Sequence, residues 1–151
     1  SERLKKVETQ RSGSDRNSYI PPVQDSIEIH EYSSMYGRKN LTGVPIMQFD
    51  KRYVHLGTVK KGEKRSYTYT FTNVGDTPMT IDIISACNCT TTEWTKGEIA
   101  PGESGQIDIV FDSKEKDYSE TIDLDVILEE VEPDTDLPII ERVVYEFDIE
   151  Q

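Results

Sequence analysis

Apolar and polar residues alternate at period two through most of the chain after Pro45. The clearest stretch is 67–72, where Tyr67, Tyr69 and Phe71 alternate with threonines. Successive side chains of a strand point to opposite faces, so this pattern predicts strands with one buried and one solvated face. Turn signals such as Asn73-Val74-Gly75-Asp76 separate the strands, with a glycine free to adopt a positive φ.

The same alternation continues at 47–49, 53–57, 79–84, 90–94, 107–111, 121–128 and 143–149, and no segment of any length has a helical period. Regularly spaced short strands of this kind predict an all-β fold, an immunoglobulin-like antiparallel β-sandwich of about seven strands around one core. Ile81 and Ile83 are predicted to face the same way, with Asp82 on the opposite face.

The first part of the chain has a different composition. Ser1–Ser18 is polar and charged, and such a segment buries too little apolar surface to offset the entropy of ordering. We therefore expect residues 1–44 to form an N-terminal arm or tether, with a candidate added strand at 27–32, where Ile27 and Ile29 alternate with polar residues. The sandwich is expected to span 45–151.

The formal net charge of −12 constrains the partners of the chain. An acidic surface repels phosphate backbones and anionic lipid headgroups, so nucleic acid is not an expected partner. The carboxylates Asp82, Asp108, Asp123 and Asp125 fall on the polar phase of their strands, which indicates a solvated sheet face.

The two cysteines, Cys87 and Cys89, lie between two predicted strands. A disulfide between residues i and i+2 needs a tight turn and would be strained, and Asn88 suits such a turn because asparagine tolerates left-handed backbone. Three hypotheses stay open: a structural pair of thiols or small disulfide, a soft-metal site in which two thiolates bind Cu(I), and thiol–disulfide chemistry.

Other site chemistry has little support in the sequence. The two histidines, His30 and His55, lie in unrelated segments, so a closed zinc site and a hydrolytic triad are both unsupported. Trp94 follows the cysteines and is expected to plug the core or cover one end of the sandwich. The chain is therefore predicted to be non-enzymatic and to need no cofactor.

Several motifs, taken in order, resemble a bacterial family of unknown function that is frequent in Bacteroidetes. Its members have an immunoglobulin-like sandwich related to the Hydin and major-sperm-protein modules. The matching stretches lie between Met47 and Asp112: they are Phe49, 57–62, 71–75, 78–81, the cysteine motif Cys87-Asn88-Cys89-Thr90, 99–105 and 110–112. The chain departs from the family pattern at Ala86 and Asn88, where the family usually has serine and glycine.

This resemblance implies an exported protein, because members typically carry secretion signals and often lipoprotein signals. It therefore implies a place in the periplasm or an outer-membrane-anchored cell envelope, with membrane contact only through an N-terminal lipid anchor. We expect a non-catalytic interaction or structural module whose partner is a protein or envelope component. The alternative is a copper-type soft-metal or thiol-redox protein centred on Cys87 and Cys89.

Overall fold

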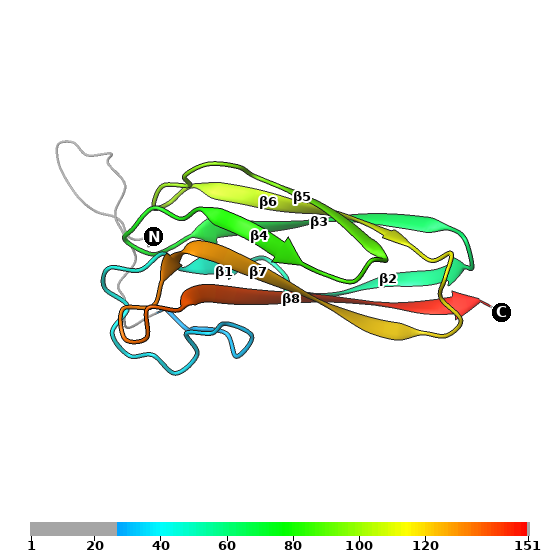
Figure 1. Ribbon diagram of the computed structural model, residues 1–151, viewed down its shortest axis with the longest axis horizontal. Coiled ribbons are helices and arrows are strands. Elements are labelled where there is room, and N and C mark those ends of the chain that lie inside the picture. Colours follow the sequence, from blue (N-terminus) through cyan, green and yellow to red (C-terminus); the bar gives the residue numbers. More distant parts are fainter. Residues whose placement is uncertain (1–26, 151) are drawn as a thin grey trace, which may run out of the picture.

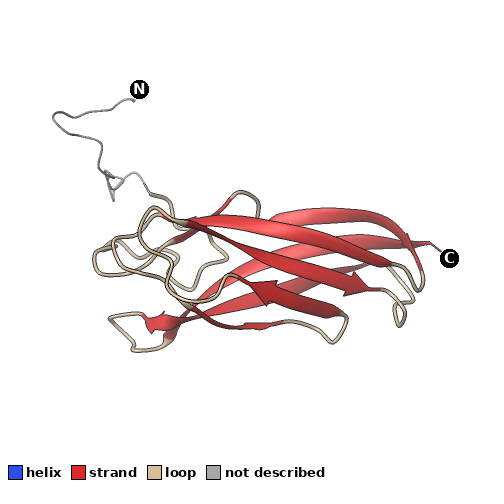
Figure 2. Cartoon of the chain, turned by 90° about the horizontal axis from the view of Figure 1, so that it is seen from above, coloured by secondary structure: helices blue, strands red, loops and turns tan. Residues whose placement is uncertain are grey.

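The computed structural model describes residues 27–150, and this range contains eight strands and no helix (Figures 1 and 2). It therefore offers no apolar helix that could cross a membrane. The strands are β1 (Met47–Phe49), β2 (Tyr53–Lys60), β3 (Lys64–Asn73), β4 (Ile81–Ser85), β5 (Thr90–Trp94), β6 (Ser104–Asp112), β7 (Glu120–Val131) and β8 (Pro138–Glu150).

The strands form two four-stranded sheets, one in the order β1-β3-β6-β5 and the other in the order β2-β8-β7-β4. All pairs are antiparallel except β2 with β8, which run parallel. The two sheets lie face to face along the long axis (Figure 1). The predicted all-β sandwich is confirmed, with eight strands in place of about seven.

The inward faces of both sheets make one core. Tyr69 and Phe71 of β3 and Phe111 of β6 are buried against Tyr145 and Phe147 of β8. The rings of Phe111 and Tyr145 lie 5.4 Å apart between centroids, which is within the range for favourable aromatic pairs. The expected role of Tyr69 as a core residue is confirmed.

The prediction that Ile81 and Ile83 share a face is wrong. Ile81 is buried, whereas Ile83 is 52% exposed. The cause is an irregularity in the pairing of β4 with β7, where the register shifts between these two residues. A bulge adds one residue to a strand, so the alternation reverses beyond it and Ile84 takes the inward position.

The segment before β1 differs from the expected arm. Residues 1–26 lie outside the described range. Residues 27–32 form no strand. The first β-type backbone pairing in the described range is an isolated bridge between Ser33 and Glu141. Met35, Leu41 and Val44 are buried in the core, so the sandwich takes in chain that the sequence assigned to the arm.

Asn73 ties the end of β3 to its surroundings and is fully buried. Its Oδ1 accepts the backbone N–H groups of Ile46 at 3.2 Å and Gly75 at 3.0 Å. Its Nδ2 donates to the backbone oxygens of Thr77 at 2.9 Å and Ile99 at 3.0 Å. One amide side chain thus satisfies four backbone groups, as buried polar groups require.

Gly75 serves this turn by its size. Its φ is not among the positive values of the described glycines, so the expected positive φ is wrong at this position. A Cβ at Gly75 would lie 2.7 Å from the Ile46 nitrogen. A glycine is needed because two backbone segments approach each other closely here.

Candidate functional site

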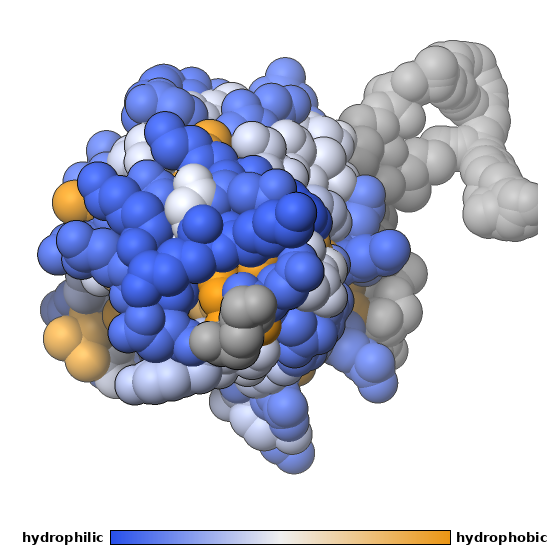
Figure 3. Space-filling view, turned by 90° about the vertical axis from the view of Figure 1, so that its right-hand side faces the viewer, coloured by the Kyte–Doolittle hydropathy of each residue, from blue (hydrophilic) through white to orange (hydrophobic). Residues whose placement is uncertain are grey.

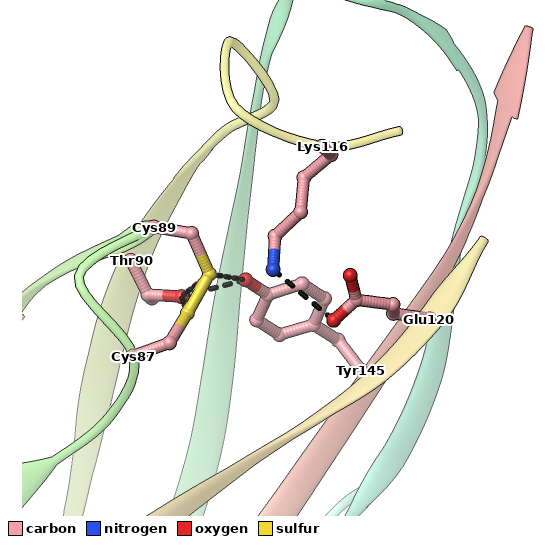
Figure 4. Close-up of a disulfide and its surroundings, with 6 residues drawn as sticks. All are labelled: Cys87, Cys89, Thr90, Lys116, Glu120 and Tyr145. Carbon is pink, nitrogen blue, oxygen red and sulfur yellow. Dashed lines mark hydrogen bonds and ion pairs between the residues drawn. A yellow bond between two sulfur atoms is a disulfide. The ribbon is translucent and has the colours of Figure 1, made fainter. Parts of the chain in front are cut away.

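The two cysteines form a disulfide at the turn between β4 and β5 (Figure 4). Their Cα atoms are 5.1 Å apart, and the Thr90 N–H donates to the Cys87 oxygen at 3.1 Å to close the turn. The expected tight turn is confirmed, with Asn88 exposed at its tip. Its expected left-handed backbone is wrong, because in the described range only Asp136 has a positive φ among residues other than glycine.

Two hydroxyl groups lie against the disulfide. The Thr90 Oγ1 is 3.3 Å from the Cys87 sulfur and 3.4 Å from the Cys89 sulfur. The Tyr145 hydroxyl is 2.6 Å from the Thr90 Oγ1 and 3.6 Å from the Cys89 sulfur. Figure 4 shows the Tyr145 hydroxyl pointing at the disulfide, and β8 contributes this residue from the opposite sheet.

Burial raises the pKa of Tyr145 to about 12, and the hydrogen bond with Thr90 opposes this rise. The phenol is therefore neutral and keeps its proton at any physiological pH. The ionisable groups drawn beside it, Lys116 and Glu120, pair with each other at 3.1 Å. The disulfide thus faces neutral hydroxyl donors.

The disulfide bears on the metal hypothesis. Soft metals bind cysteine as thiolate, and both sulfurs are used in the S–S bond. In the described range, no group of three or more histidine, cysteine, aspartate or glutamate side chains is arranged to hold a metal ion. A copper-type site at Cys87 and Cys89 therefore applies only to the reduced protein and stays a prediction.

The disulfide closes a very small loop, since only Asn88 lies between its cysteines. The chain-entropy relation for so short a loop gives a stabilisation of about 1.5 kcal/mol. We therefore expect the Cys87→Ser, Cys89→Ser double variant to remain folded and to lose about 1–2 kcal/mol of unfolding free energy. Urea unfolding of the oxidised protein and the variant measures this, and a loss above about 4 kcal/mol would contradict it.

Trp94 ends β5 and packs, partly buried, against the core, as expected for a residue that covers the interior. The Lys96 ammonium lies 3.5 Å from the centre of its ring, a cation–π contact. Its indole N–H has no hydrogen-bond partner among residues 27–150. Trp94 stands at the opposite end of β5 from Thr90, so the structure does not bring it into the disulfide site.

The carboxylates on the strands have ordinary surface roles. Asp108 accepts a hydrogen bond from the Thr68 hydroxyl at 2.7 Å. Asp123 and Asp125 both pair with Arg142, at 3.6 Å and 2.9 Å. The hydrogen bond from Arg142 to Asp125 is the main cause that raises the pKa of this guanidinium.

A buried ion pair lies near the start of β8 and was not predicted from the sequence. Glu141 is 1% exposed, its Oε1 accepts from Arg52 at 2.8 Å, and its Oε2 accepts from the Ser33 hydroxyl at 2.7 Å. Arg52 also donates to the backbone oxygens of Met47 and Arg142. The signal was Glu141 itself, a charged residue on the inward phase of a strand.

This ion pair forms part of the wall of a cleft of about 810 Å³. The cleft lies between the segment Ile27–His30 and the edge strand β1, and it is lined partly by Phe49 and Val74. Arg52 donates to Glu141 and to two backbone oxygens, and Glu141 accepts from Arg52 and Ser33, so these bonds are made within the protein. The pair therefore serves the packing of β1, β2 and β8.

A row of isoleucines crosses the outer face of the second sheet. Ile83 of β4 is paired in register with Ile127 of β7, and Ile127 with Ile140 of β8. Ile83 is 52% exposed, and the other two are half-buried. We call these three residues the isoleucine row; it starts at β4, a free edge of the sheet.

Carboxylates border the isoleucine row. Asp125 and Glu129 stand two positions before and after Ile127, and Asp82 precedes Ile83. Arg142, a cation on β8, is already paired with Asp123 and Asp125. By contrast, the visible surface at the end of the sandwich where β8 finishes is mainly hydrophilic, with an apolar area near its middle and small apolar groups toward its margin (Figure 3). The isoleucine row is thus an apolar strip in an acidic setting.

Comparison with known proteins places the chain by fold. Residues 47–143 match the family described as "Protein of unknown function (DUF1573)". No curated protein shows a significant sequence match. A protein of unknown function from Porphyromonas gingivalis W83 is 21% identical with a TM-score of 0.58, over 72% of this chain and 49% of that one.

Two further structures share the architecture. The Vibrio cholerae VesB protease is 18% identical with a TM-score of 0.54, over 68% of this chain and 31% of that one. The ASH / PapD-like domain 7 of human CEP192 is 9% identical with a TM-score of 0.52, over 95% of this chain and 99% of that one. The chain spans about half of the Porphyromonas protein and less than a third of VesB. These identities establish an immunoglobulin-like, PapD-like sandwich and nothing about activity.

Proposed function

The chain belongs to the family described as "Protein of unknown function (DUF1573)", and we propose that it is a non-catalytic binding module. The observation that carries this proposal is the isoleucine row at the free edge of β4. Ile83 is exposed, and the half-buried Ile127 and Ile140 extend its apolar area across the sheet. Contiguous apolar area on a surface is a feature of interaction sites. An edge strand also offers backbone groups to which an extended segment can add as a further strand.

The charges around this surface indicate the chemistry of the partner. Asp82, Asp125 and Glu129 border the isoleucine row, and the chain as a whole carries a formal charge of −12. A segment bearing lysine or arginine would be attracted to it, and complementary charge speeds association and selects partners. The proposed ligand is an extended protein segment in which basic residues alternate with apolar ones, so that an apolar side chain packs on Ile83.

The compartment is part of the proposal. A disulfide persists in oxidising environments, and the cysteines of the chain are paired. This supports an exported protein in the periplasm or cell envelope. Attachment through an N-terminal lipid remains a prediction from the family resemblance.

The test uses a short capped peptide of alternating lysine and valine, titrated into the protein while backbone amide signals are followed by NMR. Shifts are expected at β4 and β7, with affinity falling as salt is added. Ile83→Thr keeps a β-branched side chain but removes apolar area, so affinity should fall about tenfold. Val131→Thr is the matched control, because Val131 is 42% exposed at the end of β7.

Two further comparisons complete the test. A peptide of alternating glutamate and valine should not bind, since its charge matches that of the protein. The Cys87→Ser, Cys89→Ser variant should bind the basic peptide with the affinity of the unsubstituted protein, because the cysteines are not part of the isoleucine row. Equal binding of both peptides, or equal loss in the Ile83 and Val131 variants, would refute the proposed surface.

A further inference from the structure

The fold stabilises the small disulfide against reduction by only a small free energy. By thermodynamic linkage, the free energy that the S–S bond adds to folding equals the free energy that folding returns to the S–S bond. Because the loop contains only Asn88, this free energy is small. The bond is therefore held less firmly than one that closes a long loop. Both cysteines are also partly exposed, so an external thiol can reach them.

The hydroxyl pair has one proton that is not used between its two oxygens. Thr90 and Tyr145 each bring one O–H, and the 2.6 Å contact between their oxygens uses one of these two protons. The other proton is free to reach a sulfur, because the Thr90 oxygen lies within 3.4 Å of both sulfurs and the Tyr145 oxygen lies 3.6 Å from that of Cys89. A disulfide sulfur is a weak acceptor, whereas a thiolate is an anion that hydrogen bonds stabilise strongly.

The two sulfurs are not equivalent in this arrangement. Cys89 has both hydroxyls within reach, at 3.4 Å from Thr90 and 3.6 Å from Tyr145. Cys87 has the contact with Thr90 alone among the hydrogen bonds of its sulfur in the described range. A negative charge is therefore stabilised better on Cys89.

We propose that Cys87–Cys89 is a redox-active disulfide that exchanges with an external dithiol, with Cys89 as the leaving thiolate and with Thr90 and Tyr145 as positioning residues. This goes beyond the binding function and rests on a different part of the molecule. The exchange partner is named by its chemistry, a pair of thiols on one molecule, and it supplies both electrons.

The exchange has two steps. A thiolate of the dithiol attacks the Cys87 sulfur and bonds to it, and the Cys87–Cys89 bond breaks with its electron pair passing to Cys89. The second thiol of the dithiol loses its proton to water. The resulting thiolate attacks the first sulfur of the dithiol, which is bonded to Cys87 in the mixed disulfide, and Cys87 is released as a thiolate. The dithiol becomes a disulfide, and the protein gains two electrons.

Tyr145 remains protonated while the cysteines titrate, because its own pKa is about 12. It can therefore donate to the Cys89 thiolate throughout the range in which thiols ionise. The neighbouring Lys116 and Glu120 are paired with each other, so the net charge on this side is small.

The first measurement is the reduction of the full chain by dithiothreitol, followed by alkylation and intact mass. Tyr145→Phe removes the hydroxyl and keeps the ring that packs on Phe111, and the rate of reduction should fall about tenfold. Thr90→Val should slow reduction as well. Tyr53→Phe is the matched control: Tyr53 is 48% exposed on β2, where it pairs with Val144 and not with the buried Tyr145, and should leave the rate unchanged.

The second measurement separates positioning from mere stability. In the Cys87→Ser variant, the pH dependence of iodoacetamide alkylation gives the pKa of Cys89, which should lie below the usual value of about 8.5. Adding Tyr145→Phe should raise that pKa by about one unit. With glutathione and the oxidised protein, the trapped mixed disulfide should sit mainly on Cys87, located by peptide mapping.

Three results would overturn the proposal. They are equal reduction rates in the folded Tyr145 and Tyr53 variants, a Cys89 pKa that stays at its ordinary value, and mixed disulfide mainly on Cys89. Thermal unfolding of each variant checks that a slow rate does not come from a changed fold.

Discussion

Replacing Arg52 with methionine is expected to lower the free energy of unfolding by about 3–5 kcal/mol at neutral pH. The Arg52 and Glu141 side chains are only 9% and 2% exposed, and their charged atoms lie 2.8 Å apart. Methionine retains much of the apolar stem but leaves the Glu141 carboxylate buried without its cation. Urea unfolding at pH 7, compared with the original chain, measures the loss.

The loss should depend on pH in a defined direction. Burial raises the pKa of Glu141, and the Arg52 charge opposes that rise. Folding thus favours the protonated carboxyl, whose contribution to stability is present below the ordinary pKa and is lost as pH rises through the raised value. Without Arg52 the pKa of Glu141 rises further, so the deficit should be smaller in weak acid than at neutral pH.

A double variant separates the charge from the packing. Arg52→Met combined with Glu141→Met removes both charges and fills the site with apolar atoms, so most of the lost stability should return. Ser33 keeps one bond in that variant, because its oxygen still accepts the Met35 N–H at 3.1 Å. A single Arg52 variant within about 1 kcal/mol of the original would show that the ion pair does not hold β2 and β8 together.

Replacing Asn73 with aspartate is expected to cost about 3–5 kcal/mol, although the two side chains have the same shape. The Asn73 Nδ2 donates to the oxygens of Thr77 and Ile99, and a carboxylate offers both of them only a repelling oxygen. The new charge would also be fully buried, at 0% exposure. Thermal and urea unfolding near pH 7 test this.

Asn40→Asp is the matched control for this substitution. Asn40 is exposed, and its side-chain oxygen accepts the Thr42 N–H at 3.0 Å, which an aspartate oxygen does equally well. Its stability should change by less than about 0.5 kcal/mol. Similar effects at both positions would mean that added negative charge, and not the lost hydrogen bonds, causes the change at Asn73.

The strands of both sheets could be predicted from the sequence, because side chains in a sandwich are buried at every second position along a strand. Tyr69 and Phe71 are buried where alternation predicts, and the partly polar faces of β3 and β7 are solvated. Alternation fails at Ile83, because a bulge depends on how β4 pairs with β7 and has no signature in β4 alone.

The candidate site was only partly accessible to sequence reasoning. The turn at Asn88 follows from the spacing of the cysteines. Tyr145 does not, because it lies 55 positions from Thr90 and on the other sheet. Likewise, Glu141 meets Ser33 across 108 positions, so only the folded chain shows that the inward-facing carboxylate has a hydroxyl and a guanidinium to bind it.

The parallel pairing of β2 with β8 has a mechanical consequence. The register runs from Tyr53 opposite Val144 to Lys60 opposite Glu150, so the start of β2 and the end of β8 point to opposite ends of the long axis. Tension applied between those two points acts along the strands. The hydrogen bonds between them are then loaded in shear, all together, and not opened one after another. Such a domain would carry a pulling force with little extension until β2 and β8 separate in a single step.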